Sequence, residues 1–387
     1  MIWSAILIPI VVSLIGYLFF NHKLTIIELL LSILGGVLAI IISYYSIKSV
    51  SLTDSEYNGY MIVEARYYEP WETYVHKTCS YTTTHSCGKN CTYTVTHYYD
   101  CSYCDEHSAR YTLLDSGGNE FSITKEEYNS YVKLWSHKKP QFVELNRDIE
   151  YYGGCGKDGD MYRVNWNGRI ENSVASTTEI SFTNILKSNH SAFNYPSISK
   201  EQAKELSLYE YPTINNYYQE SVLGLDSITL QNGKYLMKYV NYLNGTLGKQ
   251  YKSKVFLLIF PNKDIDIAFK QEAYWDGGNR NEINVCVGTD KVGNIKWVKV
   301  FSWNKDKLLS VNLREDIFQN KSLNNVVPIC NIIENNVKTH YKWRDFEDFN
   351  YLSFQPTTKQ LILIYSITLI ISLVILFIGI KNNINPE

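Results

Sequence analysis

Six of the eight cysteines lie within one stretch of the chain, where their side chains could act together. They are Cys79, Cys87, Cys91, Cys101, Cys104 and Cys155, whereas Cys286 and Cys330 stand alone. An even number of cysteines in a region rich in Tyr and Thr predicts disulfides, which form and persist in oxidising compartments. Disulfides would place this region outside the cytoplasm, although the spacing does not fix which cysteines pair.

Four of these cysteines also fit a zinc site. Cys87 and Cys91 form a C-x3-C pair, and Cys101 and Cys104 form a C-x2-C pair, on either side of a short predicted strand. Four thiolates from two such pairs can hold one zinc ion in tetrahedral geometry. Nearby histidines that could also bind the ion are His85, His97 and His107. Zinc fits a reducing cytosol, so the choice depends on which side of the membrane holds the region.

A second group of side chains that could bind a metal lies in the loop Trp275–Glu282. It offers oxygen ligands suited to calcium, from Asp276, Asn279, Asn281 and Glu282. The spacing is not that of an EF-hand loop. Gly277 and Gly278 also fit a polar turn, because glycine adopts positive φ angles without strain. The sequence leaves both interpretations open.

The stretch Gly154–Gly159 has the glycine spacing G-x-G-x-x-G of a dinucleotide-binding loop. Such a loop must lead into a helix, whose N-terminus meets the pyrophosphate. Met161–Val164 instead alternates like a strand, so a glycine-rich turn is expected. No Ser/His/Asp or Cys/His pattern has a local catalytic signature. We therefore assign no catalytic residue and no cofactor other than the alternatives zinc and calcium.

The elements that position these residues divide the polar part of the chain into three zones, for a fold of the α+β class. Residues 48–175 form a Cys- and Tyr-rich β region, interrupted by a helix that begins at a capping box, Thr124 to Glu127. Residues 176–252 form a polar connecting region. Residues 253–358 form a small α/β unit. Its expected elements are strands Lys254–Phe260, Ile283–Val287 and Ile295–Trp303 and helices Asp264–Tyr274, Asp306–Phe318 and Val326–Val337.

Apolar segments at both ends of the chain predict three membrane-spanning helices. Residues 1–47 hold two of them, Ile2–Phe20 and Leu24–Ile47, as a hairpin joined by Asn21–Lys23, and residues 361–380 form the third. Each is close to the ~20 apolar residues that a helix needs to cross a bilayer. Glu28 is the one charged residue within these segments, and it lies close enough to the polar loop to reach water. The chain is therefore predicted to be a multi-pass integral membrane protein, with the lipid bilayer as a partner.

The charges near the predicted spans do not show which side of the membrane holds the polar region. Lys23 and Lys381 lie at one side of the predicted spans, and Lys48 and Lys359 lie at the other, so the positive-inside rule does not decide. The net charge of −2 gives no basic surface, and nucleic acid is not expected as a partner.

Stretches spread over most of the polar part resemble a group of membrane-anchored proteins encoded by tailed bacteriophages. They are Glu69–Val75, Tyr98–Cys104, Phe142–Asn146, Cys155–Asp160, Ala273–Asn279 and Leu313–Asp316. The resemblance implies a virus-encoded protein in a host membrane. The group has no known activity, so no activity is implied.

Residues Lys254–Ser353 are also similar in layout to the TPM domain, a small α/β domain that is often anchored by a C-terminal span. The similarity rests on the strand–helix–strand–strand order, on the Gly/Asn turn before Ile283, and on the helical stretch Val326–Phe349 before the final span. Members of that family are usually exported, and some are reported as phosphatases or divalent-metal binders. The family's Asp-Asn-Gly-like turn is replaced here by Asn279-Arg280-Asn281, which is a departure at the metal site.

Together these patterns favour a non-enzymatic, virus-encoded membrane protein whose extracytoplasmic region binds an unknown protein partner or the host envelope. One alternative is a TPM-like metal-dependent phosphohydrolase. The other is a cytosol-facing zinc scaffold at the membrane. The state of the cysteines distinguishes the extracytoplasmic binding protein from the zinc scaffold, because disulfides and zinc thiolates need opposite redox conditions.

Overall fold

The structure of the protein is a computed structural model, and its α+β class is as predicted. It describes residues 2–20, 24–89, 91–135, 139–145, 155–188, 195–349 and 351–382. The predicted connection Asn21–Lys23 and Gly154 of the glycine-spaced stretch lie outside the described residues. The chain divides into two compact units. The first unit is Met1–Glu56, Glu179–Ile198 and Arg344–Glu387, and the second unit is Tyr57–Thr178 and Ser199–Trp343.

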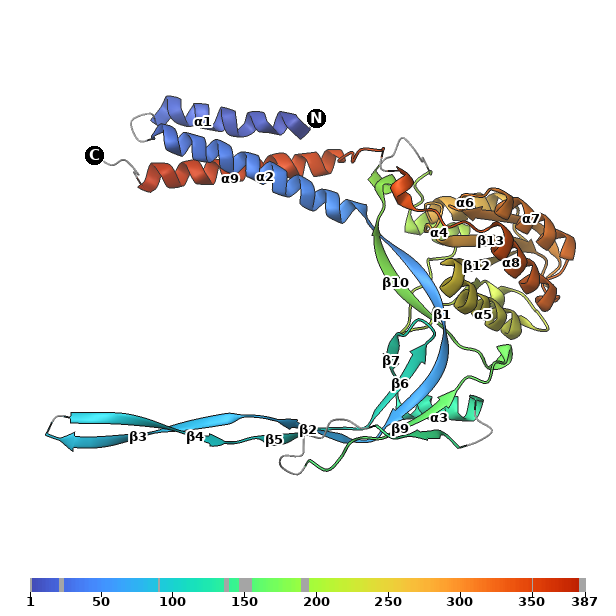
Figure 1. The fold of residues 1–387 in the computed structure, drawn as a ribbon. Coiled ribbons are helices and arrows are strands. Elements are labelled where there is room, and N and C mark those ends of the chain that lie inside the picture. Colours follow the sequence, from blue (N-terminus) through green and yellow to red (C-terminus); the bar gives the residue numbers. More distant parts are fainter. Residues whose placement is uncertain are drawn as a thin grey trace. The chain divides into compact units, whose positions relative to one another are not determined.

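The first unit contains three apolar helices that pack side by side, α1 (Leu7–Phe20), α2 (Ile26–Leu52) and α9 (Thr358–Asn382) (Figure 1). Two of them, α2 and α9, are long and apolar enough to cross a membrane. The α1 helix is shorter than the predicted span, because the short 3-10 helix Ile2–Ile6 precedes it. Pro9 explains this start, since a proline inside an α-helix would collide with the carbonyl four residues earlier.

Glu28 does not reach out to water as the sequence predicted. Its side chain is 5% exposed, and it caps α2 together with Thr25. The Thr25 backbone N–H donates to Glu28 Oε2 over 2.7 Å, and the Glu28 backbone N–H donates to Thr25 Oγ1 over 3.4 Å. The carboxylate thereby satisfies a backbone donor at the start of the helix, which keeps it close to the helix end. The pattern Thr25-Ile-Ile-Glu28 was a signal for this role.

Small residues let the three helices approach closely. A Cβ atom added to Gly36 of α2 would lie 2.5 Å from Pro9 Cβ and 2.7 Å from Ser372 Oγ. One turn away, the buried Ser32 hydroxyl donates to the Ser372 carbonyl over 3.2 Å. Close backbone approach and interhelical hydrogen bonds are the usual means by which apolar helices associate in lipid.

The second unit contains a six-stranded sheet and one covering helix. The sheet has the order β7-β6-β1-β9-β8, and β10 also pairs with β1. Helix α3 (Lys125–Trp135) begins at the predicted Thr124 to Glu127 capping box. Its residues Tyr128, Tyr131 and Trp135 pack on the sheet. The strands are β1 (Thr53–Tyr68), β6 (Arg110–Asp115), β7 (Glu120–Ser122), β8 (Gln141–Val143), β9 (Met161–Asn165) and β10 (Ala175–Thr183).

The α/β part of the second unit is a four-stranded sheet of the order β11-β12-β13-β14. The first three strands are parallel and β14 is antiparallel. The strands are β11 (Val222–Leu223), β12 (Lys254–Pro261), β13 (Glu282–Thr289) and β14 (Ile295–Ser302). The helices are α4 (Lys200–Leu206), α5 (Gly233–Tyr251), α6 (Asp266–Tyr274), α7 (Leu308–Asn320) and α8 (Val326–His340). The predicted order from strand Lys254 onward is therefore the observed one.

The two faces of this sheet differ in chemistry. Alternate side chains of β12 and β13, such as Val255, Leu257 and Val285, pack against α5, α7 and α8 in the main apolar core. The opposite face carries aromatic and polar side chains and contacts α6 through rings such as Phe256 and Trp275. Helices α5 and α6 therefore connect successive parallel strands across opposite faces. Only one of these two connections can have the usual right-handed sense.

Helix α5 lies in a stretch that the sequence assigned to the polar connecting region. Its apolar residues Leu236, Val240 and Leu243 are fully buried in the same core as β12. Its glycines obscured the pattern, because glycine is unfavourable inside a helix. They are needed for packing: a Cβ atom at Gly248 would lie 2.5 Å from the Gly59 carbonyl oxygen of β1.

We expect Gly36→Val to destabilise the three-helix bundle of the first unit by about 1–3 kcal/mol, the usual cost of forcing extra atoms into a packed site. Thermal unfolding of the full-length protein in detergent measures the loss. Ser46→Val is the matched control, because it adds a similar side chain to an exposed position of α2. Equal melting temperatures for the two variants would contradict the close packing at Gly36.

Candidate functional site

The most distinctive element of the second unit is a two-stranded ribbon, β3 (Thr78–Gly88) with β4 (Cys91–Asp100), which we call the ribbon (Figure 1). The strands are antiparallel and form a sheet of their own. Most of their side chains are exposed, and only Cys79, Thr83, Val95 and His97 are partly buried. A two-stranded hairpin without a core is marginally stable in water. The ribbon therefore needs another source of order.

Disulfides supply this order at both ends of the ribbon. Cys79 pairs with Cys101 at the open end, with Cα atoms 5.8 Å apart, and Cys87 pairs with Cys91 beside the turn, with Cα atoms 5.1 Å apart. Such bonds favour the folded hairpin by restricting the unfolded chain. Cross-links at both ends also oppose any slip of one strand along the other.

The third disulfide joins Cys104 to Cys155, so all six clustered cysteines are paired. The four predicted zinc ligands are not brought together as one set. Cys87 and Cys91 bond to each other, whereas Cys101 and Cys104 bond to partners outside the set. A sulfur in a disulfide is not a thiolate and does not act as a zinc ligand.

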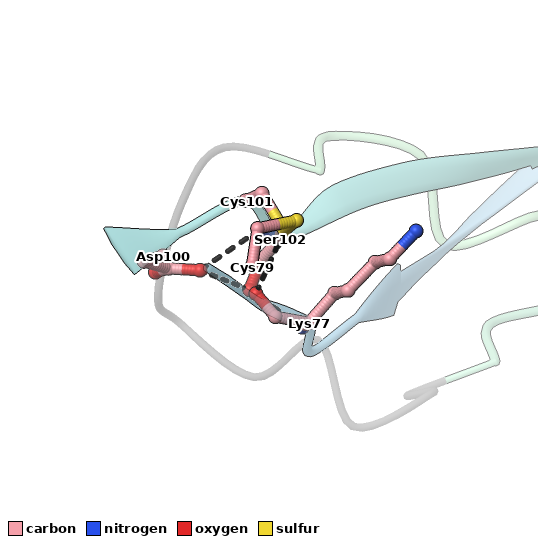
Figure 2. The surroundings of a disulfide bond; sticks show 5 residues. All are labelled: Lys77, Cys79, Asp100, Cys101 and Ser102. Atoms are coloured by element: carbon pink, nitrogen blue, oxygen red, sulfur yellow. Dashed lines mark hydrogen bonds between the residues drawn. A yellow bond between two sulfur atoms is a disulfide. The ribbon is translucent and has the colours of Figure 1, made fainter. Parts of the chain in front are cut away.

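The open end of the ribbon is ordered by hydrogen bonds as well (Figure 2). The Cys101 N–H donates to the Lys77 carbonyl over 2.9 Å, and the Lys77 N–H donates to Ser102 Oγ over 3.1 Å. The Ser102 N–H donates to Asp100 Oδ1 over 2.9 Å, and its hydroxyl donates to the same oxygen over 2.5 Å. These bonds from Ser102 lower the pKa of Asp100, because they favour the charged carboxylate.

A carboxylate connects the neighbouring strands β2 (Trp71–Val75) and β5 (Tyr103–His107) to the segment after Cys155. Glu72 Oε2 accepts from the Gly156 N–H over 3.0 Å, and Lys157 Nζ lies 3.0 Å from Glu72 Oε1. The bond from Gly156, followed by the one from Lys157, lowers the pKa of Glu72. The glycine-spaced stretch leads into strand β9, which confirms the strand that the sequence predicted there.

The register of the ribbon separates two faces. Tyr81 lies opposite His97, Thr83 opposite Val95, and His85 opposite Tyr93, so these side chains share one face. The rings of Tyr81 and His97 stack with centroids 4.9 Å apart, and those of His85 and Tyr93 stack at 5.3 Å. The other face carries hydroxyl groups and one exposed tyrosine, from Ser80, Thr82, Thr84, Ser86, Thr92, Thr94, Thr96 and Tyr98. Neither strand carries a charged side chain before Asp100 at the end of β4.

This arrangement suits recognition more than bond-breaking chemistry. It presents aromatic rings, imidazoles and hydroxyls on a rigid neutral surface, with Tyr98 74% exposed. Tyrosine and small hydroxyl residues provide contact area and hydrogen bonds at a low entropic cost. The sequence showed the alternation of Tyr and Thr, but it did not show which residues share a face.

The four predicted calcium ligands of the loop Trp275–Glu282 do not converge on one point. Glu282 is fully buried, and its oxygens accept hydrogen bonds from Tyr211 Oη at 2.5 Å and from Asn279 Nδ2 at 2.7 Å. Asn281 donates elsewhere, to the Tyr57 carbonyl over 3.1 Å. Asp276 is exposed, with a φ angle of 49°. The structure therefore brings together Asn279 and Glu282 only.

Lys254, which the sequence marked only as the start of a buried strand, is the fully buried neighbour of Glu282 across β12 and β13. Its Nζ donates to Thr177 Oγ1 over 2.9 Å. Burial lowers the pKa of Lys254 to about 7, and the nearby Glu282 opposes this shift. Burial likewise raises the pKa of Glu282. Lys254 thereby joins β12 to β10 through Thr177, whereas Glu282 accepts hydrogen bonds from Tyr211 and Asn279.

We expect Lys254→Met to gain stability relative to wild type at pH 6 and to lose that advantage towards pH 10. In the unfolded chain the lysine keeps its ordinary pKa of about 10.4, so that state binds more protons above pH 7. Lys254 therefore loses its proton above about pH 7 in the folded protein but keeps it up to about pH 10 in the unfolded chain. The wild-type free energy of unfolding consequently rises with pH between these values. Thermal unfolding of full-length protein across this range measures the effect. An exposed lysine variant, Lys249→Met, is the control, and a pH-independent difference for Lys254→Met would contradict the account.

We also expect the double variant Cys87→Ser with Cys91→Ser to loosen the turn end of the ribbon alone. A short disulfide contributes roughly 2 kcal/mol, so amide exchange in the ribbon should accelerate by about tenfold or more. Hydrogen exchange with mass spectrometry measures this. The buried strand β13 is the internal control, and equal acceleration in β13 would show that the disulfide supports the whole unit instead.

No protein-family model, curated protein or solved structure matches this chain. The resemblances to phage membrane proteins and to the TPM domain therefore stay predictions. Function is inferred from the geometry of the chain's own residues.

Proposed function

We propose that the protein is a virus-encoded, membrane-anchored binding protein, and that its ribbon contacts a partner on the outer side of a host membrane. The observation that carries this proposal is the ribbon itself, an exposed and neutral hairpin with a disulfide at each end. A hairpin that adds nothing to a core has no evident structural task. Its side chains are available for contact with another molecule.

The anchor in this proposal is the three-helix bundle of the first unit. Helices α2 and α9 meet the length and hydropathy requirements for crossing a bilayer, and α1 packs against both. We propose that all three helices lie in the membrane. The exposed apolar side chains of the bundle, such as Leu18, Ile26 and Phe377, then face lipid tails. In water they would form a large exposed apolar surface.

The state of the cysteines supports an outer location for the second unit. Three disulfides in one unit are unusual in a reducing cytosol and common in exported proteins. The two remaining cysteines, Cys286 and Cys330, are buried. Burial raises the pKa of both thiols, so they resist oxidation and disulfide exchange.

The surface of the ribbon supports binding to a partner by contact and hydrogen bonding rather than by charge. Several of its tyrosines are at least half exposed, namely Tyr81, Tyr93, Tyr98 and Tyr99. Tyrosine is enriched in binding surfaces because its ring buries area and its hydroxyl forms a directed hydrogen bond. The partner is therefore expected to present uncharged groups to the ribbon.

Neither alternative function gains support from a contact among the described residues. The calcium ligands of a TPM-like phosphohydrolase do not converge, and Glu282 is engaged by protein donors. Calcium binding by the full-length protein, lost in Asp276→Ala, would nevertheless revive that alternative. A zinc scaffold requires thiolates, whereas the clustered cysteines are paired.

We expect a membrane-impermeant maleimide to label intact cells that produce the protein only after treatment with an impermeant reductant. Before reduction the six clustered cysteines are in disulfides and the other two are buried. Labelling is measured as a mass shift of the protein on a gel. A variant with serine at all six clustered positions should stay unlabelled, which assigns the signal to the disulfides.

The opposite pattern would refute the outer location. If labelling needs no reductant but does need permeabilised cells, the cysteines are free thiols in the cytoplasm. The zinc scaffold would then become the better proposal.

A further inference from the structure

The aromatic face of the ribbon holds two imidazoles that converge on one hydroxyl. His97 Nε2 lies 2.9 Å from Thr83 Oγ1, and His85 Nε2 lies 3.0 Å from the same oxygen. His85 is two residues beyond Thr83 on β3, whereas His97 reaches it from β4. Two imidazole nitrogens and one hydroxyl oxygen from two strands therefore meet at one place.

Stacking holds both rings in orientation. Tyr81 stacks on His97 with an interplanar angle of 21°, and Tyr93 stacks on His85 at 23°. Each tyrosine lies directly across the ribbon from its histidine. The disulfides at both ends of the ribbon maintain this register. The nitrogens are thus arranged before any ligand binds, which lowers the entropic cost of binding.

The hydroxyl alone can donate to at most one of the two Nε2 atoms, because it has a single hydrogen. At least one ring must therefore carry its proton on Nε2 and donate it to Thr83 Oγ1. A metal ion removes that requirement, because it accepts the lone pair of both Nε2 atoms while the ring protons move to Nδ1.

The chemistry of the surroundings selects the class of ion. Imidazole nitrogen suits copper, zinc and nickel, and among divalent ions of this series copper binds most tightly. Calcium and magnesium need oxygen-rich sites, and the ribbon strands offer no carboxylate before Asp100. The sulfurs of the ribbon are in disulfides, so the histidines are its remaining nitrogen or sulfur ligands.

We propose that His85 and His97, with Thr83 between them, form a surface site for a late first-row divalent metal ion, with Cu²⁺ bound most tightly. The two Nε2 atoms are the principal ligands, and water completes the coordination. The site bridges β3 and β4, so the ion adds a cross-strand link between the two disulfides. This proposal rests on the geometry of the ribbon and does not depend on which side of the membrane the ribbon occupies.

The test is a copper titration of the full-length protein in detergent, prepared without a polyhistidine tag. Electron paramagnetic resonance of bound Cu²⁺ reports nitrogen ligands by their hyperfine splitting. We expect wild type to bind one Cu²⁺ ion saturably, with the signature of two imidazole nitrogens. Zn²⁺ should compete for the same site.

Three single variants assign the ligands. His85→Gln and His97→Gln should each weaken copper binding by about tenfold or more, the equivalent of about 1.4 kcal/mol. His107→Gln is the matched control, because His107 contacts Thr73 on the neighbouring β2–β5 pair and lies outside the site. It should bind copper as wild type does. Thermal unfolding confirms that each variant is folded, which is expected because the ribbon adds to no core.

Two results would overturn the proposal. One is a wild-type protein that shows no saturable copper binding, or only a signal without two nitrogen ligands. The other is copper binding that survives unchanged in both His85→Gln and His97→Gln. A second measurement keeps the test independent of affinity: bound Zn²⁺ should slow amide exchange in the ribbon of wild type and not in the two variants.

Discussion

Backbone contact between β1 and α5 is the constraint on which the second unit depends. Gly59 and Gly248 meet where a Cβ atom on Gly248 would lie 2.5 Å from the Gly59 carbonyl oxygen, and a Cβ atom on Gly59 would lie 2.3 Å from the Asn244 carbonyl oxygen. Side chains at these positions would separate the six-stranded sheet from the α/β part. Gly248 costs helix stability in α5, and the packing of Leu236 and Leu243 in the core offsets that cost.

Buried polar side chains complete the same junction. Lys254 donates to Thr177, and Asn281 donates to the Tyr57 carbonyl and to Asn58. Polar groups in an interior are tolerated when they are hydrogen-bonded, and they favour one arrangement over others because a misaligned partner is left unpaired. Asn281 of the predicted metal-binding loop therefore helps to hold the second unit together.

The ribbon is ordered by covalent cross-links instead of by buried contacts. It has no core to align it, and disulfides at both ends supply the order that burial supplies elsewhere. Its surface is consequently free of packing constraints. Tyrosines, threonines and histidines can be arranged on it for contact with a partner and, in the case of His85 and His97, for a metal ion.

Much of the fold was predictable because local patterns survive in it. The capping box at Thr124 predicted α3, and the run from Lys254 to Phe260 predicted β12, since a continuous apolar run of that length is typical of a buried strand. Helix α5 was missed, because its glycines and asparagines have a purpose only when β1 is packed against it. The shortened α1 and the buried Glu28 were missed although Pro9 and Thr25 carried the local signals.

The sequence by itself determined the apolar helices, the α+β class, the order of the α/β elements and the cluster of six cysteines. These follow from composition and from patterns that repeat within a few residues. Only the tertiary structure decided which cysteines pair, that Asn281 turns away from Glu282, and that His85 and His97 converge on Thr83. Pairing and convergence depend on strand register and on contacts between distant segments, which the spacing of residues along the chain does not encode.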